Sequence, residues 1–320
     1  MSYILSDTIT TEDGKPLMVT PTKYTHPNIE RRERDKAFFK NFINEVNERI
    51  FSVLTPDIDS LAICCYLEDV WGVPIGGYYD FNRLVVSEEI LQMGRNHPFY
   101  ADCDVNGHEW GIGNHVRVVG ENGMCFNLND GIVADSYTEK CGASAYVTAL
   151  YFDNKDFNDL TLMQKTFLIF VDSFYLQYLN FREQWDFWTD YIGCGCLTEI
   201  LDTTCPREQI KARIENKKRK YGFDENINLH DGLLSTRMNI PEINQHFEMN
   251  LRLPQRHFDR LIATFRNSGK RHESVLWNED VTQIFSNTRH STHTVKYSTI
   301  SHIENGFYRY DRCGNLIEIN

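Results

Sequence analysis

Two short aspartate motifs stand directly after apolar, strand-length runs of this sequence. Asp57 and Asp59 follow the first run and open an apolar, helix-length segment, while Asp102 and Asp104 follow a later run. In open α/β sheets, ligands bind at the carboxyl ends of the strands, so carboxylates at two such ends can hold a pair of divalent cations. An isolated Asp-x-Asp-Ser sequence is more often a helix N-cap. The recurrence of aspartates after a second run is what favours metal chemistry.

Further polar residues with chemical potential follow these two motifs. His108 and His115 lie in a glycine-rich segment that suits metal or phosphate chemistry, although a lone loop histidine is more often a surface residue. Asp172 is set in the most hydrophobic segment of the chain, where a carboxylate is costly unless it is paired or bound to metal. A hydrogen bond to a neighbouring helix or a pairing with Arg182 would satisfy Asp172 equally well.

The order of these motifs resembles that of the DHH phosphoesterase superfamily. This superfamily includes single-strand exonucleases, oligonucleotide-degrading enzymes, cyclic-dinucleotide phosphodiesterases and manganese pyrophosphatases. The resemblance covers about residues 50–179, a little under half of the chain. Residues 112–116 stand where the namesake Asp-His-His motif is expected, and residues 141–145 resemble the small-residue helix start that follows it. The resemblance implies that Asp57, Asp59, Asp102 and Asp172 bind metal.

The second motif and the namesake triplet both leave an assignment open. Asp104 is the fallback metal ligand if the second motif is displaced by one pleat of the strand. In the triplet, Gly113-Asn114-His115 replaces Asp-His-His. Asn114, a weaker neutral oxygen ligand, therefore stands in place of a metal-binding histidine, and the resemblance implies that His115 faces the substrate phosphate. His108 is a candidate to contribute from the same loop.

Two basic clusters in the second half of the chain are candidates for holding phosphate. One is the run at residues 217–220, and the other contains Arg266, Lys270 and Arg271. Basic runs are more often solvated faces, and helix C-termini attract them for electrostatic reasons. We favour the second cluster as the substrate-binding one, because Ser268-Gly269 permits close approach of the backbone to an anion.

The hydrophobic pattern predicts an α/β fold. Between residues 50 and 152, short apolar runs alternate with amphipathic helix-length segments, which is typical of a mostly parallel sheet flanked by helices. Long helices are then predicted, including residues 160–179 and 254–266, before strands at the end. Because 320 residues favour two lobes, we expect a DHH-like metal-binding lobe at 1–195, opened by a hairpin and a helix, and a second α+β accessory lobe at 196–320.

Composition limits the partners and the compartment. The formal net charge of -12 excludes a protein that coats nucleic acid through its whole surface, so any such contact must be local. Nine scattered cysteines favour a reducing cytoplasm over a disulfide framework. The N-terminal residues lack the pattern of a signal peptide, and no apolar segment is long enough to span a bilayer.

These observations together predict a cytoplasmic, metal-dependent hydrolase. It would use two Mn²⁺ or Mg²⁺ ions to cleave phosphodiester or phosphoanhydride bonds in nucleotides or short single-stranded nucleic acid, as a nuclease or phosphodiesterase does. Asp102 and His115 would be its catalytic residues. The altered triplet favours an alternative, a degenerate DHH-like protein that binds nucleotide, nucleic acid or a protein partner without hydrolysis. A third possibility is a two-lobed interaction protein in which the succession of motifs is chance, and Asp57 and Asp102 should then lie far apart. Four carboxylates within coordination distance of one point would support the metal site, and scattered ones would end the hypothesis.

Overall fold

The structure is a computed structural model of the whole chain, and part of the chain is described. The described residues are 29–81, 83–106, 110–115, 124–129, 140–267, 283–288, 291–300, 302–303, 306–310 and 316–319. The expected N-terminal hairpin and the candidates His108, Lys270 and Arg271 lie outside the described residues, and Arg266 is described by its backbone alone.

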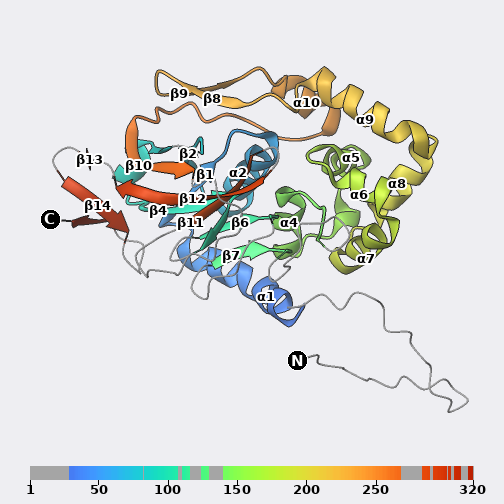
Figure 1. Cartoon of the computed structure of the whole chain (residues 1–320), viewed down its shortest axis with the longest axis horizontal. Helices are drawn as coiled ribbons and strands as arrows, with labels where there is room; N and C mark the ends of the chain where they lie inside the picture. Colours follow the sequence, from blue (N-terminus) through green and yellow to red (C-terminus); the bar gives the residue numbers. More distant parts are fainter. Residues whose placement is uncertain are drawn as a thin grey trace, which may run out of the picture.

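A ten-stranded mixed sheet forms the centre of the fold (Figure 1), in the order β5-β11-β12-β10-β3-β2-β1-β4-β6-β7. Its strands are β1 (Ile50–Leu54), β2 (Ile75–Tyr79), β3 (Arg83–Val86), β4 (His97–Ala101), β5 (Asp104–Asn106), β6 (Trp110–Gly113), β7 (Met124–Asn127), β10 (Arg260–Asn267), β11 (Gln283–Thr288) and β12 (Ser291–Ile300). The neighbours β2, β1, β4, β6 and β7 are parallel, and the remaining pairs are antiparallel. The expected α/β class is confirmed, and the sheet is parallel in one half and antiparallel in the other.

Successive residues of the central strand β1 face opposite sides of the sheet. Ile50 and Leu54 belong to the larger core, which also takes residues from α1 (Ile29–Val46), α2 (Ile58–Trp71) and α4 (Ala145–Phe152). Phe51 and Val53 belong to a smaller core on the other face, to which α3 (Glu88–Gln92) contributes Ile90. A strand covered on both faces is apolar at nearly every position, which is why the run at 50–54 stands out in the sequence.

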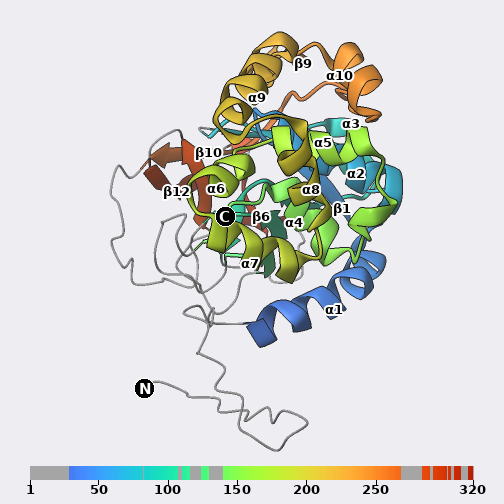
Figure 2. The same cartoon turned by 90° about the vertical axis from the view of Figure 1, so that its right-hand side faces the viewer.

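A block of helices stands between β7 and β10 in the chain and contacts α4 through the ring pairs Tyr146–Phe167 and Tyr151–Tyr191 (Figure 2). It comprises α5 (Leu162–Phe170), α6 (Phe174–Asn180), α7 (Arg182–Ile192), α8 (Cys196–Thr204), α9 (Arg207–Tyr221) and α10 (Ile240–Phe247), with the hairpin β8 (Ile227–His230) and β9 (Leu233–Thr236) between the last two. A separate small sheet contains β13 (His302–Ile303), β14 (Gly306–Tyr310) and β15 (Leu316–Ile319). No helix in the described part of the chain has the length and apolar character needed to cross a membrane.

The expected division at residues 195 and 196 stays a prediction. The larger core runs from Phe39 to Phe258, and β10, β11 and β12 join the same sheet as β1. Elements on both sides of the expected boundary therefore share one core and one sheet.

Two helix predictions differ from the structure. The expected single helix at 160–179 is interrupted between Phe170 and Phe174, which separates α5 from α6 and leaves Asp172 in the break. The helix expected at 254–266 is wrong, because Arg260–Asn267 forms β10 and pairs with β3 and β12. Hydrogen bonding to two neighbouring strands outweighs the helical spacing of apolar residues in this segment.

Candidate functional site

The ends of two neighbouring strands bring Asp57 and Asp102 together. β1 and β4 are parallel partners in which Val53 lies opposite Tyr100, so both strands end at the same edge of the sheet. Asp57 caps α2, and its carboxylate accepts the backbone N–H of Ser60 at 2.8 Å. The side chains of Asp57 and Asp102 share a hydrogen bond. The two aspartate motifs are therefore in contact, contrary to what a chance succession predicts.

Ser60 ties the two strand ends into one unit. Its hydroxyl accepts the N–H of Thr55 at 2.8 Å and donates to the carbonyl of Ala101 at 3.1 Å, both in a buried environment. The next residue, Asp102, has a left-handed backbone with φ of 52°. A non-glycine residue in this conformation costs roughly 1 to 3 kcal/mol and persists where surrounding contacts fix it, often at functional sites.

Asp59 is committed to the start of α4. Its two carboxylate oxygens accept the backbone N–H groups of Ala145 and Tyr146, each at 2.8 Å. A helix N-terminus favours negative charge and leaves such N–H groups to be satisfied. Burial nevertheless raises the pKa of Asp59 well above its usual value, and repulsion from Asp172 and Asp57 adds to that effect.

Asp172 joins this group from the break between α5 and α6. The Asn114 amide donates to the carbonyl of Ala143 at 2.8 Å and to the Asp172 carboxylate at 3.4 Å. The anticipated alternative, a pairing of Asp172 with Arg182, is not found, because Arg182 pairs with Asp186 and Asp202. Asn114 and Asp172, from motifs far apart in the chain, are therefore neighbours.

Asp104 and His115 form a separate pair beside the cluster. The Asp104 carboxylate is fully buried and lies 2.9 Å from both the backbone nitrogen and Nδ1 of His115. Asp104 also accepts from Cys125 and Asn127. A Cβ on Gly113 would lie 2.5 Å from its carboxylate, so only glycine leaves room there. These contacts give Asp104 an orienting role, which fixes Nδ1 of His115 as the donor and leaves Nε2 available.

We call Asp57, Asp59, Asp102 and Asp172 the acidic cluster. Desolvation raises the pKa of Asp57, Asp59 and Asp102, and for Asp59 and Asp102 repulsion from the other members comes next. In the described part of the chain, no lysine or arginine forms an ion pair with any of the four. The repulsion among these carboxylates is not balanced by ion pairs with lysine or arginine, and a bound cation would reduce it.

The donor chemistry of the cluster suits a hard divalent cation, but its present arrangement is not that of a ligand shell. Carboxylate and amide oxygens are the ligands that Mg²⁺ and Mn²⁺ prefer. Within the described residues, no group of three or more His, Cys, Asp or Glu side chains is arranged to hold a metal ion. Asp57 and Asp102 bond to each other instead. Because burial raises the pKa of both groups, binding an ion there requires their carboxyl groups to lose any proton they hold.

Comparisons with known proteins return no relative. No protein-family model, curated protein or solved structure matches this chain. The family resemblance therefore remains a prediction that depends on the motifs and on their positions in the fold.

The candidate basic residues occupy different positions. β10 runs parallel to β1, three strands away, so the backbone of Arg266 lies at the same sheet edge as Asp57, roughly 14 Å along the sheet. Lys218 of α9 lies closer to the cluster, because its ammonium group donates to the carbonyl of Asp172 at 3.3 Å. Lys218 belongs to the basic run at residues 217–220, which the sequence analysis favoured less than the cluster around Arg266. Its contact with Asp172, 46 positions earlier, could not be predicted from local sequence patterns.

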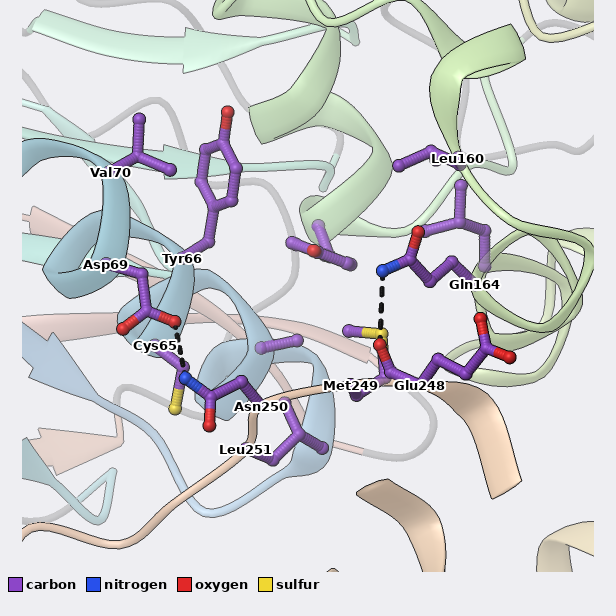
Figure 3. Close-up of a pocket in the computed structure, with 13 residues that line it drawn as sticks. Cys65, Tyr66, Asp69, Val70, Leu160, Gln164, Glu248, Met249, Asn250 and Leu251 are labelled. Atoms are coloured by element: carbon purple, nitrogen blue, oxygen red, sulfur yellow. Dashed lines mark hydrogen bonds between the residues drawn. The ribbon is translucent and has the colours of Figure 1, made fainter. Parts of the chain in front are cut away.

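Two pockets lie outside the acidic cluster. The pocket in Figure 3, of about 220 Å³, is bordered by α2, α4, α5 and the segment after α10. Its polar groups are largely paired with each other: Asn250 donates to Asp69 at 2.9 Å, and Gln164 donates to the carbonyl of Glu248 at 3.1 Å. None of the four clustered aspartates lines this pocket or the larger one between α5, α8 and α9.

Proposed function

We propose that this chain is a metal-dependent phosphoesterase of the DHH type, which hydrolyses phosphodiester or phosphoanhydride bonds in nucleotides or short single-stranded nucleic acid. The observation that carries the proposal is the contact between Asp57 and Asp102. It joins two separate motifs at the sheet edge where α/β proteins bind their ligands. Among the described residues, no lysine or arginine forms an ion pair with a carboxylate of the acidic cluster around that contact, which supports a role in binding cations.

The metal ligands would come from the acidic cluster and its neighbour Asn114. Asp57, Asp102 and Asp172 are the principal candidates, since both oxygens of Asp59 already accept N–H groups of α4. When bound, Mn²⁺ or Mg²⁺ supplies a water of lowered pKa and neutralises charge on the phosphoryl group. Because folding raises the pKa of Asp57 and Asp102, their carboxylates become available as ligands as the pH rises, so affinity for the metal increases with pH.

His115 would act on the substrate phosphate. Its Nδ1 is held by Asp104 at 2.9 Å, and its side chain is 13% exposed, so the ring is oriented but reachable. With Nδ1 donating to Asp104, Nε2 of the neutral ring accepts a proton, and Nε2 of the imidazolium donates to a phosphate oxygen or to the leaving oxygen. Lys218, beside Asp172, and Arg266, at the same sheet edge, are the cations available to bind further phosphates. Lys270 and Arg271 remain predicted substrate-binding residues.

A specific observation favours a second candidate function, the binding of a nucleotide or oligonucleotide without hydrolysis. Asn114 stands where the resembled family has a metal-binding histidine, and its amide donates hydrogen bonds to Ala143 and Asp172. No described group of three or more His, Cys, Asp or Glu side chains is arranged around a metal position. A site that has lost a ligand can retain affinity for the phosphate while losing its catalytic ions.

One experiment tests the proposed function directly. Titration calorimetry with Mn²⁺ should show binding by the wild type and by Asp186→Asn, whose carboxylate lies on an exposed helix surface, but not by Asp102→Asn. Hydrolysis of nucleotides, dinucleotides, cyclic dinucleotides and short single strands should follow the same order and stop in EDTA. Hydrolysis that persists in EDTA or in Asp102→Asn would remove this site from the mechanism. Binding of an oligonucleotide without any hydrolysis would select the second candidate.

A further inference from the structure

A second, independent feature is an apolar pocket between α5, α8 and α9, three helices that lie together in Figure 2. Its volume is about 290 Å³. Its walls include Met163, Ile169, Phe170, Ile200, Ile210 and Ile214. This volume is near the lower limit of roughly 300 Å³ for small-molecule sites, which are mostly apolar with a few placed polar groups. The volume and the apolar lining of the pocket therefore suit a small apolar group of a ligand.

Two cations of α9 line the same pocket, one helical turn apart. Arg213 uses one guanidinium nitrogen to bond the carbonyl of Thr204 at 3.0 Å, and the ammonium of Lys217 lies 5.7 Å from the centre of the Phe170 ring. Neither forms an ion pair with any described residue. Burial lowers the pKa of Lys217, and the positive charge of Arg213 lowers it further. A bound anion would stabilise both positive charges and offset their mutual repulsion.

Other lysines of α9 form ion pairs with acidic residues. Lys211, Lys218 and Lys220 have acidic partners, at 3.8 Å from Glu215, 3.8 Å from Asp224 and 2.7 Å from Glu242 respectively. None of these three lysines lines the pocket. The charges of Arg213 and Lys217, which border the apolar pocket, are therefore not matched by an acid among the described residues.

We infer that this pocket binds a small organic acid, with its carboxylate between Arg213 and Lys217 and its apolar body against Phe170, Ile200 and Ile210. Guanidinium and ammonium groups one helical turn apart can bind the two oxygens of one carboxylate, and charge-assisted hydrogen bonds of this kind are strong. The apolar walls select a body without polar groups, since an unpaired polar group buried there is costly. This binding site is separate from the acidic cluster and does not depend on the proposed hydrolysis.

Octanoate is a suitable probe, because it combines a carboxylate with a small aliphatic body. Titration calorimetry on the full chain should detect octanoate binding, whereas acetate, which lacks the body, and octanol, which lacks the charge, should bind at least about tenfold more weakly. Cys205 also lines the pocket and is partly exposed, so octanoate should slow its reaction with a thiol reagent in a Cys196→Ser, Cys313→Ser background. Equal binding of octanol would overturn the assignment of an anion.

The matched variants keep the fold and change only the charges. Arg213→Gln with Lys217→Gln should weaken octanoate binding about tenfold or more, while Lys211→Gln, on the same helix but outside the pocket, should leave it unchanged. Circular dichroism and melting of each unliganded variant establish that the helix is intact. Absence of octanoate binding to the wild type at millimolar concentration, or undiminished binding by the double variant, would overturn the inference.

Discussion

The carboxyl groups of Asp57 and Asp102 lie within hydrogen-bonding contact of each other at the ends of two neighbouring strands. Desolvation, the largest effect on each, raises the pKa of both groups, and for Asp102 repulsion from the other acidic residues adds to it. A proton held between two carboxylates is a substitute for the cation that such a pair otherwise attracts. The contact links the strand ends of β1 and β4, and the raised pKa values make the stability of the fold depend on pH.

The first prediction concerns that pH dependence. Because the pKa values of Asp57, Asp59 and Asp102 are raised by folding, the folded chain binds their protons more tightly than the unfolded chain. Their contribution to stability is therefore full below the ordinary aspartate pKa of 3.8 and is lost as pH rises through the raised values. The free energy of unfolding of the metal-free Asp102→Asn variant should exceed that of the wild type at mildly alkaline pH, by about 1.4 kcal/mol for each unit of the removed pKa shift.

Denaturant unfolding over a pH series checks this expectation. The advantage of Asp102→Asn should shrink toward acidic pH, where Asp102 is protonated in both folded and unfolded chains. Asp186→Asn provides the control, since this carboxylate is 54% exposed and lies outside the acidic cluster. An advantage that is independent of pH would mean that Asp102 does not titrate in the way inferred.

The second prediction concerns Asp59, whose oxygens accept the N–H groups of Ala145 and Tyr146. Asp59→Ala leaves two buried donors without partners, and we expect a loss of about 2 to 4 kcal/mol in the free energy of unfolding, measured with guanidinium chloride. Asp59→Asn retains one acceptor oxygen and should lose less. If Asp59→Ala is as stable as the wild type, α4 does not depend on this carboxylate, and a role in metal binding becomes the better account of Asp59.

The third prediction separates orientation from metal binding. Asp104→Asn removes the charged acceptor that holds Nδ1 of His115, so the turnover of a phosphodiester substrate should fall by about 10- to 100-fold. The affinity for Mn²⁺, measured by calorimetry, should change little, because Asp104 bonds to His115, Cys125 and Asn127 rather than to the cluster.

A double-mutant cycle provides the control for this third prediction. His115→Gln and Asp104→Asn together should lower turnover no more than His115→Gln alone, since Asp104 acts through His115. Additive losses, or loss of Mn²⁺ affinity in Asp104→Asn, would show that Asp104 has another role in the site.

Local patterns in the sequence were sufficient to predict the parallel half of the sheet and the meeting of its two aspartate motifs. β1 is apolar at four of five positions and buried on both faces, so its start and end are evident from the sequence. Asp57 and Asp102 each follow the end of such a strand, and adjacent parallel strands end at one edge. The alternation of strands and helices in the sequence predicts parallel neighbouring strands. Asp57 and Asp102 are close together because they follow two such strands.

Contacts between distant segments were not predictable from the same patterns. The break at Asp172 interrupts a continuous apolar run, because α6 turns away to pack on α7. β10 has helical spacing, and only its pairing with β3 and β12 makes it a strand. Lys218 reaches Asp172 through the packing of α9 on α6. In each case the deciding partner lies far along the chain, where periodicity carries no information.

The last prediction distinguishes an enzyme from a protein that only binds. Asn114 is the neighbour of Asp172 at 3.4 Å and stands where the resembled family has a metal-binding histidine. In an active but weakened site, Asn114→His should tighten Mn²⁺ binding and raise turnover, because an imidazole is the stronger ligand for such ions.

The same substitution gives a different result in a site that has lost its chemistry. Mn²⁺ uptake would then improve while hydrolysis stays absent on every phosphate substrate, and the wild type would bind nucleotide or oligonucleotide without metal. Calorimetry and a hydrolysis assay on the same preparation measure both quantities, with Asn129→Ser as a control for disturbing the loop, since Asn129 donates to the carbonyl of Asn114. If Asn114→His changes neither metal affinity nor turnover, Asn114 does not line the site. The role of the adjacent His115 would then have to be abandoned as well, because both residues were assigned from one motif.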